Sequence, residues 1–123
     1  MLRIYLIEDN PVIRENLSET LTEMVGASTV GSSETASGAK AWLADNEAEW
    51  DLAIVDLFLK QGNGMQVVAA CSDRTEAQKV IVLSNYVSPE VRVECLRLGA
   101  DAVFDKSSDI DALIEYCEKL TIH

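Results

Sequence analysis

Short runs of apolar residues alternate along the chain with longer segments in which apolar residues recur every three or four positions. The runs predict strands at residues 3–7, 28–32, 52–55, 80–83 and 102–104. The intervening segments predict helices: Asn10-Pro11 and Ser88-Pro89 mark two helix starts, and Ser107 or Ser108 is expected to cap the last helix. Near-continuous apolar strands alternating with helices are typical of a parallel sheet covered on both faces. The pattern predicts a doubly wound α/β fold with five strands and five helices, forming one domain over residues 1–123.

Composition and charge narrow the class of protein. The chain is 48% hydrophobic and 25% charged, which is ordinary for a globular domain. Its net charge of −11 argues against direct contact with nucleic acid, because phosphate backbones attract basic surfaces. A bilayer-spanning run of about 20 apolar residues is missing, as is a signal peptide. We therefore expect a cytoplasmic protein that does not bind membranes.

The cysteines and the histidine do not form a recognisable metal motif. Cys71, Cys95 and Cys117 are widely spaced in helical segments, and His123 is the last residue. Without a C-x-x-C pair or a neighbouring histidine, these residues exclude the usual zinc sites. We expect three reduced thiols that pack as small hydrophobic residues.

Polar residues with complementary chemistry follow four of the predicted strands. Glu8-Asp9 ends the first strand, Asp56 the third, Ser84 the fourth and Lys106 the fifth. Because the carboxyl ends of parallel strands meet at one edge of a sheet, these side chains are expected to converge. Each of them alone has an ordinary role as a helix cap, a turn residue or a solvated charge. Together, they predict one shared site.

The residue types at this predicted site indicate phosphoryl chemistry. Three clustered carboxylates need a cation, and oxygen ligands favour a hard metal such as Mg²⁺. Lys106 and Ser84 are suited to contact phosphoryl oxygens. An aspartate carboxylate can itself become an aspartyl phosphate, which makes Asp56 the candidate nucleophile.

The same residues carry a family resemblance that covers essentially the whole chain. An acidic pair after the first strand, Asp after the third, Ser after the fourth and Lys after the fifth resemble the receiver domain of response regulators in two-component signalling. The segments from Asp56 to Gly64 and from Gly99 to Ala102 also resemble that family. The resemblance implies a flavodoxin-like sheet with strand order 2-1-3-4-5. It also implies a phosphoprotein that acts in a phosphorelay, as single-domain chemotaxis regulators do.

The resemblance assigns a role to each matching residue. Asp56 would accept a phosphoryl group from a phosphohistidine on a sensor histidine kinase or a histidine phosphotransfer protein. The residues that would hold Mg²⁺ are Asp9, Asp56, the backbone carbonyl of Phe58 and, through water, Glu8. The residues that would bind phosphate and drive the switch are Ser84, the backbone N–H of Asn85, and Lys106. The protein would catalyse only its own phosphorylation and dephosphorylation.

Some positions depart from the common receiver pattern. Lys60 stands where proline is frequent, which would change the stiffness of the loop. Val103 stands where the family has its switching aromatic residue, and Phe104 or Tyr86 are the candidates to replace it. Phe58 and Tyr86 each lie two residues beyond a site residue. Their rings either shield an acyl phosphate from water or simply pack the rim of the site.

Two other classes of protein use the same kind of α/β fold. A phosphotransfer enzyme of the haloacid-dehalogenase kind would need a second aspartate two residues after the nucleophile, where this chain has Phe58. A nucleotide- or flavin-binding domain would need a glycine-rich phosphate motif, which is missing.

Within signalling, the form of the output is open. A stand-alone receiver is expected because the chain starts at Met1 and stops after the last helix. The alternative is a fragment of a larger DNA-binding regulator. The downstream protein partner is undefined, and a homodimer is an option.

Overall fold

The computed structural model describes residues 1–121, in which strands and helices alternate from the first element to the last. His123 lies outside the described residues. The five strands are β1 (Arg3–Ile7), β2 (Ser28–Ser33), β3 (Leu52–Val55), β4 (Lys79–Ser84) and β5 (Ala102–Asp105). The five helices of this range are α1 (Pro11–Val25), α2 (Ala36–Asp45), α3 (Gly64–Ala70), α4 (Pro89–Arg97) and α5 (Ile110–Thr121).

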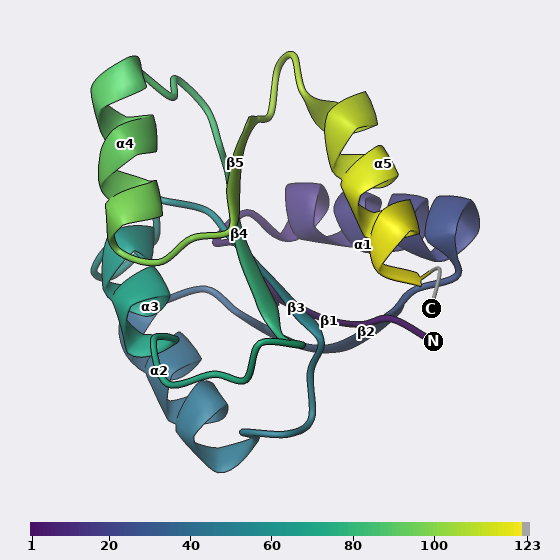
Figure 1. Cartoon of the computed structure of the whole chain (residues 1–123), viewed down its shortest axis with the longest axis horizontal. Helices are drawn as coiled ribbons and strands as arrows, with labels where there is room; N and C mark the ends of the chain where they lie inside the picture. The colour runs from purple at the N-terminus through teal and green to yellow at the C-terminus, as the bar shows by residue number, and fades with distance from the viewer. Residues whose placement is uncertain (122–123) are drawn as a thin grey trace.

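The strands form one parallel sheet in the order β2-β1-β3-β4-β5. Helices α1 and α5 cover one face of the sheet, and α2, α3 and α4 cover the other (Figure 1). This arrangement confirms the expected doubly wound, flavodoxin-like fold. The expected strand order 2-1-3-4-5 is confirmed as well.

Two hydrophobic clusters lie on either side of the sheet, and alternate strand residues contribute to each. On β1, Tyr5 and Ile7 join the cluster under α2, α3 and α4, whereas Ile4 and Leu6 join the cluster under α1 and α5. All four residues of β3 are buried. Burial on both faces explains why the central strands are near-continuous apolar runs. Their rigid ends position the polar residues that follow them.

The predicted starts of the first and fourth helices are confirmed. The Asn10 side chain accepts hydrogen bonds from the N–H groups of Val12 and Ile13, and Ser88 accepts one from Val91. Each cap thereby satisfies backbone donors that the first helical turn leaves free. Asn10 caps the helix that follows the acidic pair, so it also sets the direction in which the chain leaves the predicted site.

The expected serine cap of the last helix is wrong. Helix α5 begins at Ile110, so the residue before it is Asp109. Ser107 donates from both its N–H and its hydroxyl to the Asp105 carboxylate, at 2.8 and 2.5 Å. Ser107 is therefore bonded to Asp105 at the end of β5 and does not cap α5.

The helices described in residues 1–121 do not include one with the length and apolar composition of a membrane span.

Candidate functional site

Asp56 follows β3 and occupies the centre of the polar cluster at the carboxyl edge of the sheet. Its side chain is buried, with both carboxylate oxygens engaged. Oδ1 accepts hydrogen bonds from the Ser84 hydroxyl at 2.8 Å and from the Phe58 N–H at 3.2 Å. Oδ2 accepts one from Lys106 Nζ at 2.9 Å. The structure therefore brings the ends of β3, β4 and β5 together around one carboxylate, as the sequence predicts.

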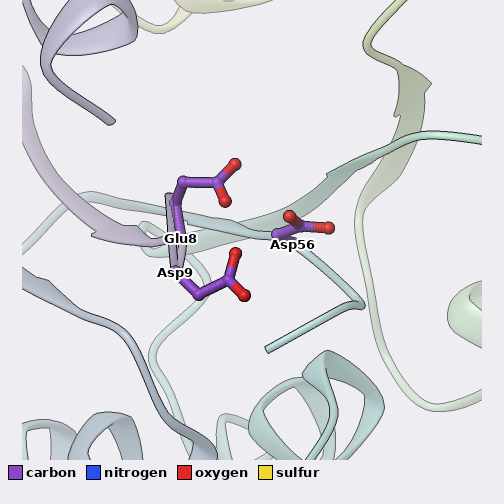
Figure 2. A group of neighbouring side chains, drawn as sticks. All are labelled: Glu8, Asp9 and Asp56. Atoms are coloured by element: carbon purple, nitrogen blue, oxygen red, sulfur yellow. The ribbon is translucent and has the colours of Figure 1, made fainter. Parts of the chain in front are cut away.

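The acidic pair after β1 completes the cluster. Figure 2 shows the carboxyl groups of Glu8, Asp9 and Asp56 gathered at the ends of two neighbouring strands, and one oxygen from each lies within 4.8 Å of the others. Glu8 is buried and Asp9 is half-buried. Glu8 forms an ion pair with Lys106 and accepts the N–H of Asn10 at 3.1 Å. Lys106 is therefore shared between Glu8 and Asp56.

The electrostatics of the cluster follow from one cation facing several anions. Burial raises the pKa of Glu8 above its ordinary value of 4.5, and the hydrogen bond from Lys106 offsets only part of this effect. Burial alone would lower the pKa of Lys106, but its hydrogen bonds to Glu8 and Asp56 outweigh burial and raise this pKa above 10.5. The site thus holds a firmly charged lysine and an excess of carboxylate.

The donor atoms of the cluster fit a hard divalent cation. Glu8, Asp9 and Asp56 offer carboxylate oxygens, and sulfur and imidazole ligands are missing from this group. Mg²⁺ typically binds through one or two carboxylates and keeps several waters. The residues present therefore fit magnesium, and a bound cation would balance the charge that Lys106 leaves uncompensated.

The remaining predicted site residues lie around the rim or behind it. Phe58 is 61% exposed and Tyr86 is 91% exposed, so the Tyr86 ring packs against little of the protein. Tyr86 also has a left-handed backbone conformation with φ of 56°. Asn85 is exposed beside it. The Tyr86 ring therefore makes little contact in this structure, and its shielding of an acyl phosphate stays a prediction.

The two β5 candidates for the switch lie on opposite sides of the sheet. Val103 is buried in the cluster under α2, α3 and α4. Phe104 packs edge-on against Tyr116 of α5, with ring centroids 5.8 Å apart. Tyr86 alone among the candidates lies in the loop that follows Ser84. An Arg92 guanidinium nitrogen donates to the Val103 carbonyl at 2.7 Å and joins α4 to β5.

Sequence reasoning missed a group of charged residues beside the site. Arg14 donates from one guanidinium nitrogen to the Glu8 carbonyl at 2.9 Å and to the Glu34 carboxylate at 3.2 Å. Lys60 pairs with the other Glu34 oxygen at 3.0 Å. Two signals were available. Glu34 follows β2 as Asp56 follows β3, and Arg14 lies one helical turn after Asn10.

Comparison with known families and proteins identifies relatives of the chain. The family model described as the response regulator receiver domain matches residues 4–118. The chain is 32% identical over 119 residues to the transcriptional regulatory protein QseB of Escherichia coli O157:H7, covering 97% of this chain and 51% of that protein. It is 28% identical over 100 residues to the DNA-binding transcriptional activator DevR/DosR of Mycobacterium tuberculosis, covering 81% and 45%. The chain spans about half the length of the curated relatives it matches.

Solved structures share the fold at lower sequence identity. The response regulator domain of Thermotoga maritima CheB superposes with a TM-score of 0.83 at 16% identity, covering 100% of this chain and 98% of that chain. The CheX–CheY–BeF₃–Mg²⁺ complex of Borrelia burgdorferi contains a chain that superposes with a TM-score of 0.87 at 14% identity, covering 99% and 90%. The family model does not favour the alternative of a haloacid-dehalogenase-like enzyme. With a family model matched over residues 4–118 and the corresponding fold in place, this chain belongs to the response regulator receiver domain family.

Proposed function

We propose that this chain is a phosphoacceptor switch of a two-component or phosphorelay system, with residues 1–123 acting as one receiver domain and Asp56 as the phosphorylated residue. One observation carries the proposal. The Asp56 carboxylate receives the Ser84 hydroxyl on one oxygen and the Lys106 ammonium on the other, beside two further carboxylates. A hydroxyl and an ammonium at this position can bind phosphoryl oxygens once the carboxylate carries the group.

The phosphoryl group is expected to come from a phosphohistidine on a sensor histidine kinase or a histidine phosphotransfer protein. One Asp56 oxygen attacks phosphorus, the P–N bond breaks, and the imidazole leaves with the bonding electrons. Lys106, the Ser84 hydroxyl and the Asn85 N–H then receive the phosphoryl oxygens. The chain acts on its own Asp56 and does not turn over a separate substrate.

Magnesium is the proposed cofactor, held by Asp9, Asp56, the Phe58 carbonyl and, through water, Glu8. When bound, the ion supplies positive charge that neutralises the phosphoryl oxygens and the crowded carboxylates. One structure of the same fold supports magnesium, and a second supports the phosphorylated state. The Borrelia burgdorferi complex contains BeF₃ and Mg²⁺, and RcsB of Salmonella enterica was solved bound to a promoter with BeF₃⁻ described as phosphomimetic.

Ser84 links the chemistry to the surface. When its hydroxyl moves from Asp56 to a phosphoryl oxygen, we expect the loop from Asn85 to Ser88 to move with it. Phosphorylation changes the surface only as far as it favours one of the two arrangements. We propose that a protein partner reads this change on the surface formed by α4, β5 and α5. Tyr86 is the candidate aromatic element of the switch, because Val103 is buried and Phe104 packs against α5.

The proposed compartment and partners of the switch rest on separate observations. Cys71, Cys95 and Cys117 are buried free thiols, which fits a reducing cytoplasm. The net charge of −11 argues that the segment itself does not contact nucleic acid. Several relatives are DNA-binding regulators about twice as long as this chain, so the output of a complete protein could still reach DNA through another segment. A second proposed output is the formation of a homodimer.

Intact-mass measurement after incubation with MgCl₂ and acetyl phosphate tests the proposal. The wild type should gain one phosphoryl group, and Asp56→Asn should gain none. Asp51→Asn is the matched control, because it makes the same change at the opposite edge of the sheet, and it should be modified like the wild type. A phosphoryl gain in Asp56→Asn equal to that of the wild type would contradict the proposal.

A further inference from the structure

Glu34 links two loops of the site through its two carboxylate oxygens. Oε1 accepts from Arg14 at 3.2 Å, and Oε2 accepts from Lys60 at 3.0 Å. The same Arg14 nitrogen donates to the Glu8 carbonyl at 2.9 Å. Arg14 therefore reaches the loop after β1, and Lys60 belongs to the loop after β3. These are the two loops that carry the proposed magnesium ligands, yet none of these three side chains is itself a proposed ligand.

Backbone contacts join the same segments and keep Glu34 in place. The Lys60 N–H donates to the Glu34 carbonyl at 3.3 Å, and the Ala36 N–H donates to the Gln61 carbonyl at 2.8 Å. The Ser37 N–H reaches the Gln61 side chain at 3.1 Å. The loop after β3 is thus attached to the start of α2. The position of Lys60 is consequently set by main-chain contacts as well as by its charge.

We propose that Glu34 is a positioning residue for the magnesium site, and that Arg14, Glu34 and Lys60 form a brace that holds the two ligand loops at the separation the ion requires. This inference rests on the proposed function, since it concerns the same metal. The hydrogen bonds that Glu34 accepts from Lys60 and Arg14 lower its pKa, as expected for a carboxylate held between two cations.

Substitution of Lys60 separates a brace from a simple electrostatic effect. Removing the positive charge of Lys60 would, through the field alone, strengthen the binding of a cation nearby. Loss of the brace would instead weaken binding, because the loop must be ordered when the ion binds. Lys60→Met therefore gives opposite signs under the two accounts. Glu34→Gln weakens Mg²⁺ binding under both accounts. The size of that weakening reports the loss of the two ion pairs that Glu34 forms with Arg14 and Lys60.

The test is the dissociation constant of Mg²⁺ alone, measured by an amide NMR titration with MgCl₂. We expect Lys60→Met to weaken binding by about threefold and Glu34→Gln by about fivefold, the range that exposed ion pairs support. Lys119→Met is the matched control. It removes an exposed lysine paired with Glu115 at 3.3 Å on α5, and it should leave the dissociation constant unchanged. Thermal unfolding of each variant verifies that the fold is intact.

The outcomes distinguish this inference from the proposed function. If the wild type binds Mg²⁺ and Lys60→Met binds it equally well or more tightly, the brace is overturned while the phosphoacceptor proposal stands. If the wild type itself does not bind Mg²⁺, the proposed metal site fails, and the brace fails with it. Weaker binding in Lys60→Met with unchanged binding in Lys119→Met supports the brace.

Discussion

The two edges of the sheet both carry charged networks, but the networks are balanced differently. At the amino edge, Arg74 is paired with Asp101 at 2.9 Å, and Arg3 with Asp51 at 3.0 Å. At the carboxyl edge, Lys106 pairs with both Glu8 and Asp56, and Asp9 lies close by. Each of these two amino-edge pairs matches one carboxylate with one guanidinium, whereas the carboxyl-edge cluster has one ammonium for three carboxylates.

This difference separates a structural network from a site. Arg74 and Lys106 are similarly buried, with 13% and 12% of their side chains exposed, so burial does not distinguish them. Arg74 directs its remaining donors to backbone carbonyls of Gln78, Cys71 and Gly99. A balanced network stabilises the fold by itself, but an unbalanced one is stabilised further by a cation. The imbalance is therefore the feature that indicates function.

Removal of the lysine at the unbalanced edge is expected to have the largest effect. Lys106→Met leaves the buried carboxylates of Glu8 and Asp56 without their cation, which should lower the free energy of unfolding by about 3 kcal/mol in EDTA. Chemical denaturation measures this loss. Addition of MgCl₂ should restore more stability in the variant than it adds to the wild type, because Lys106 no longer competes with the ion. An equal increment in both proteins would contradict the account.

The corresponding change at the amino edge should lower the free energy of unfolding by less, and the loss should not depend on magnesium. Arg74→Met leaves the carboxylate of Asp101 and three carbonyls without this donor, but Arg74 lines a cavity of about 690 Å³ from which water can reach them. We expect the free energy of unfolding, measured with denaturant, to fall by about 2 kcal/mol. The increment from MgCl₂ should equal that of the wild type. A magnesium increment that differs from the wild-type value would mean that the two edges are coupled.

The aromatic residues at the rim should affect the lifetime of the phosphorylated state. Replacing Phe58 with alanine opens the approach to Asp56 and should speed dephosphorylation several-fold, because water is no longer excluded. Tyr86→Ala should have a smaller effect, since this ring is 91% exposed. Decay of the phosphorylated protein, followed by intact mass after removal of acetyl phosphate, measures both rates. Unchanged rates in both variants would refute the shielding hypothesis.

A smaller pH effect is expected at the amino edge. Hydrogen bonds from Arg3 lower the pKa of Asp51 below its ordinary value of 3.8. The pair therefore adds stability above pH 3.8, and this contribution is lost as the pH falls through the lower, folded-state pKa. Because Asp51 is partly exposed, solvent screening keeps the contribution below about 1 kcal/mol. The unfolding free energies of wild type and Asp51→Asn should differ at neutral pH and converge in strong acid, below the folded-state pKa. A constant difference would show that the ion pair is not responsible.

The fold and the centre of the site could be predicted because they depend on backbone periodicity. Strands such as β3, whose residues are all buried, need an apolar residue at each position, and the residues that follow them must share one edge. That rule is enough to bring Asp56, Ser84 and Lys106 together from the order of residues along the chain. The second strand is less apolar, so its pattern locates its end less accurately and does not draw attention to Glu34.

Other features depend on side chains that local patterns do not specify. Arg14 reaches Glu34 across the sheet edge from a helix, and a long flexible side chain has many potential partners. The cap of α5 is predicted wrongly because Asp105 competes for Ser107. The sequence pattern also does not determine which face of the sheet Val103 and Phe104 occupy. It depends on the register of β5 against β4, in which Val103 lies beside Val82.

The most direct test is to locate the acyl phosphate by chemical reduction. Borohydride delivers one hydride to the acyl carbon of an aspartyl phosphate and expels phosphate, and a second hydride reduces the resulting aldehyde, leaving homoserine at the modified position. Wild-type protein treated with MgCl₂ and acetyl phosphate, then reduced and digested, should contain homoserine in place of Asp56 in the peptide mass spectrum. Reduction at Glu8 or Asp9 instead, or phosphorylated protein with Asp56 unreduced, would contradict the assignment of Asp56 as the phosphoacceptor.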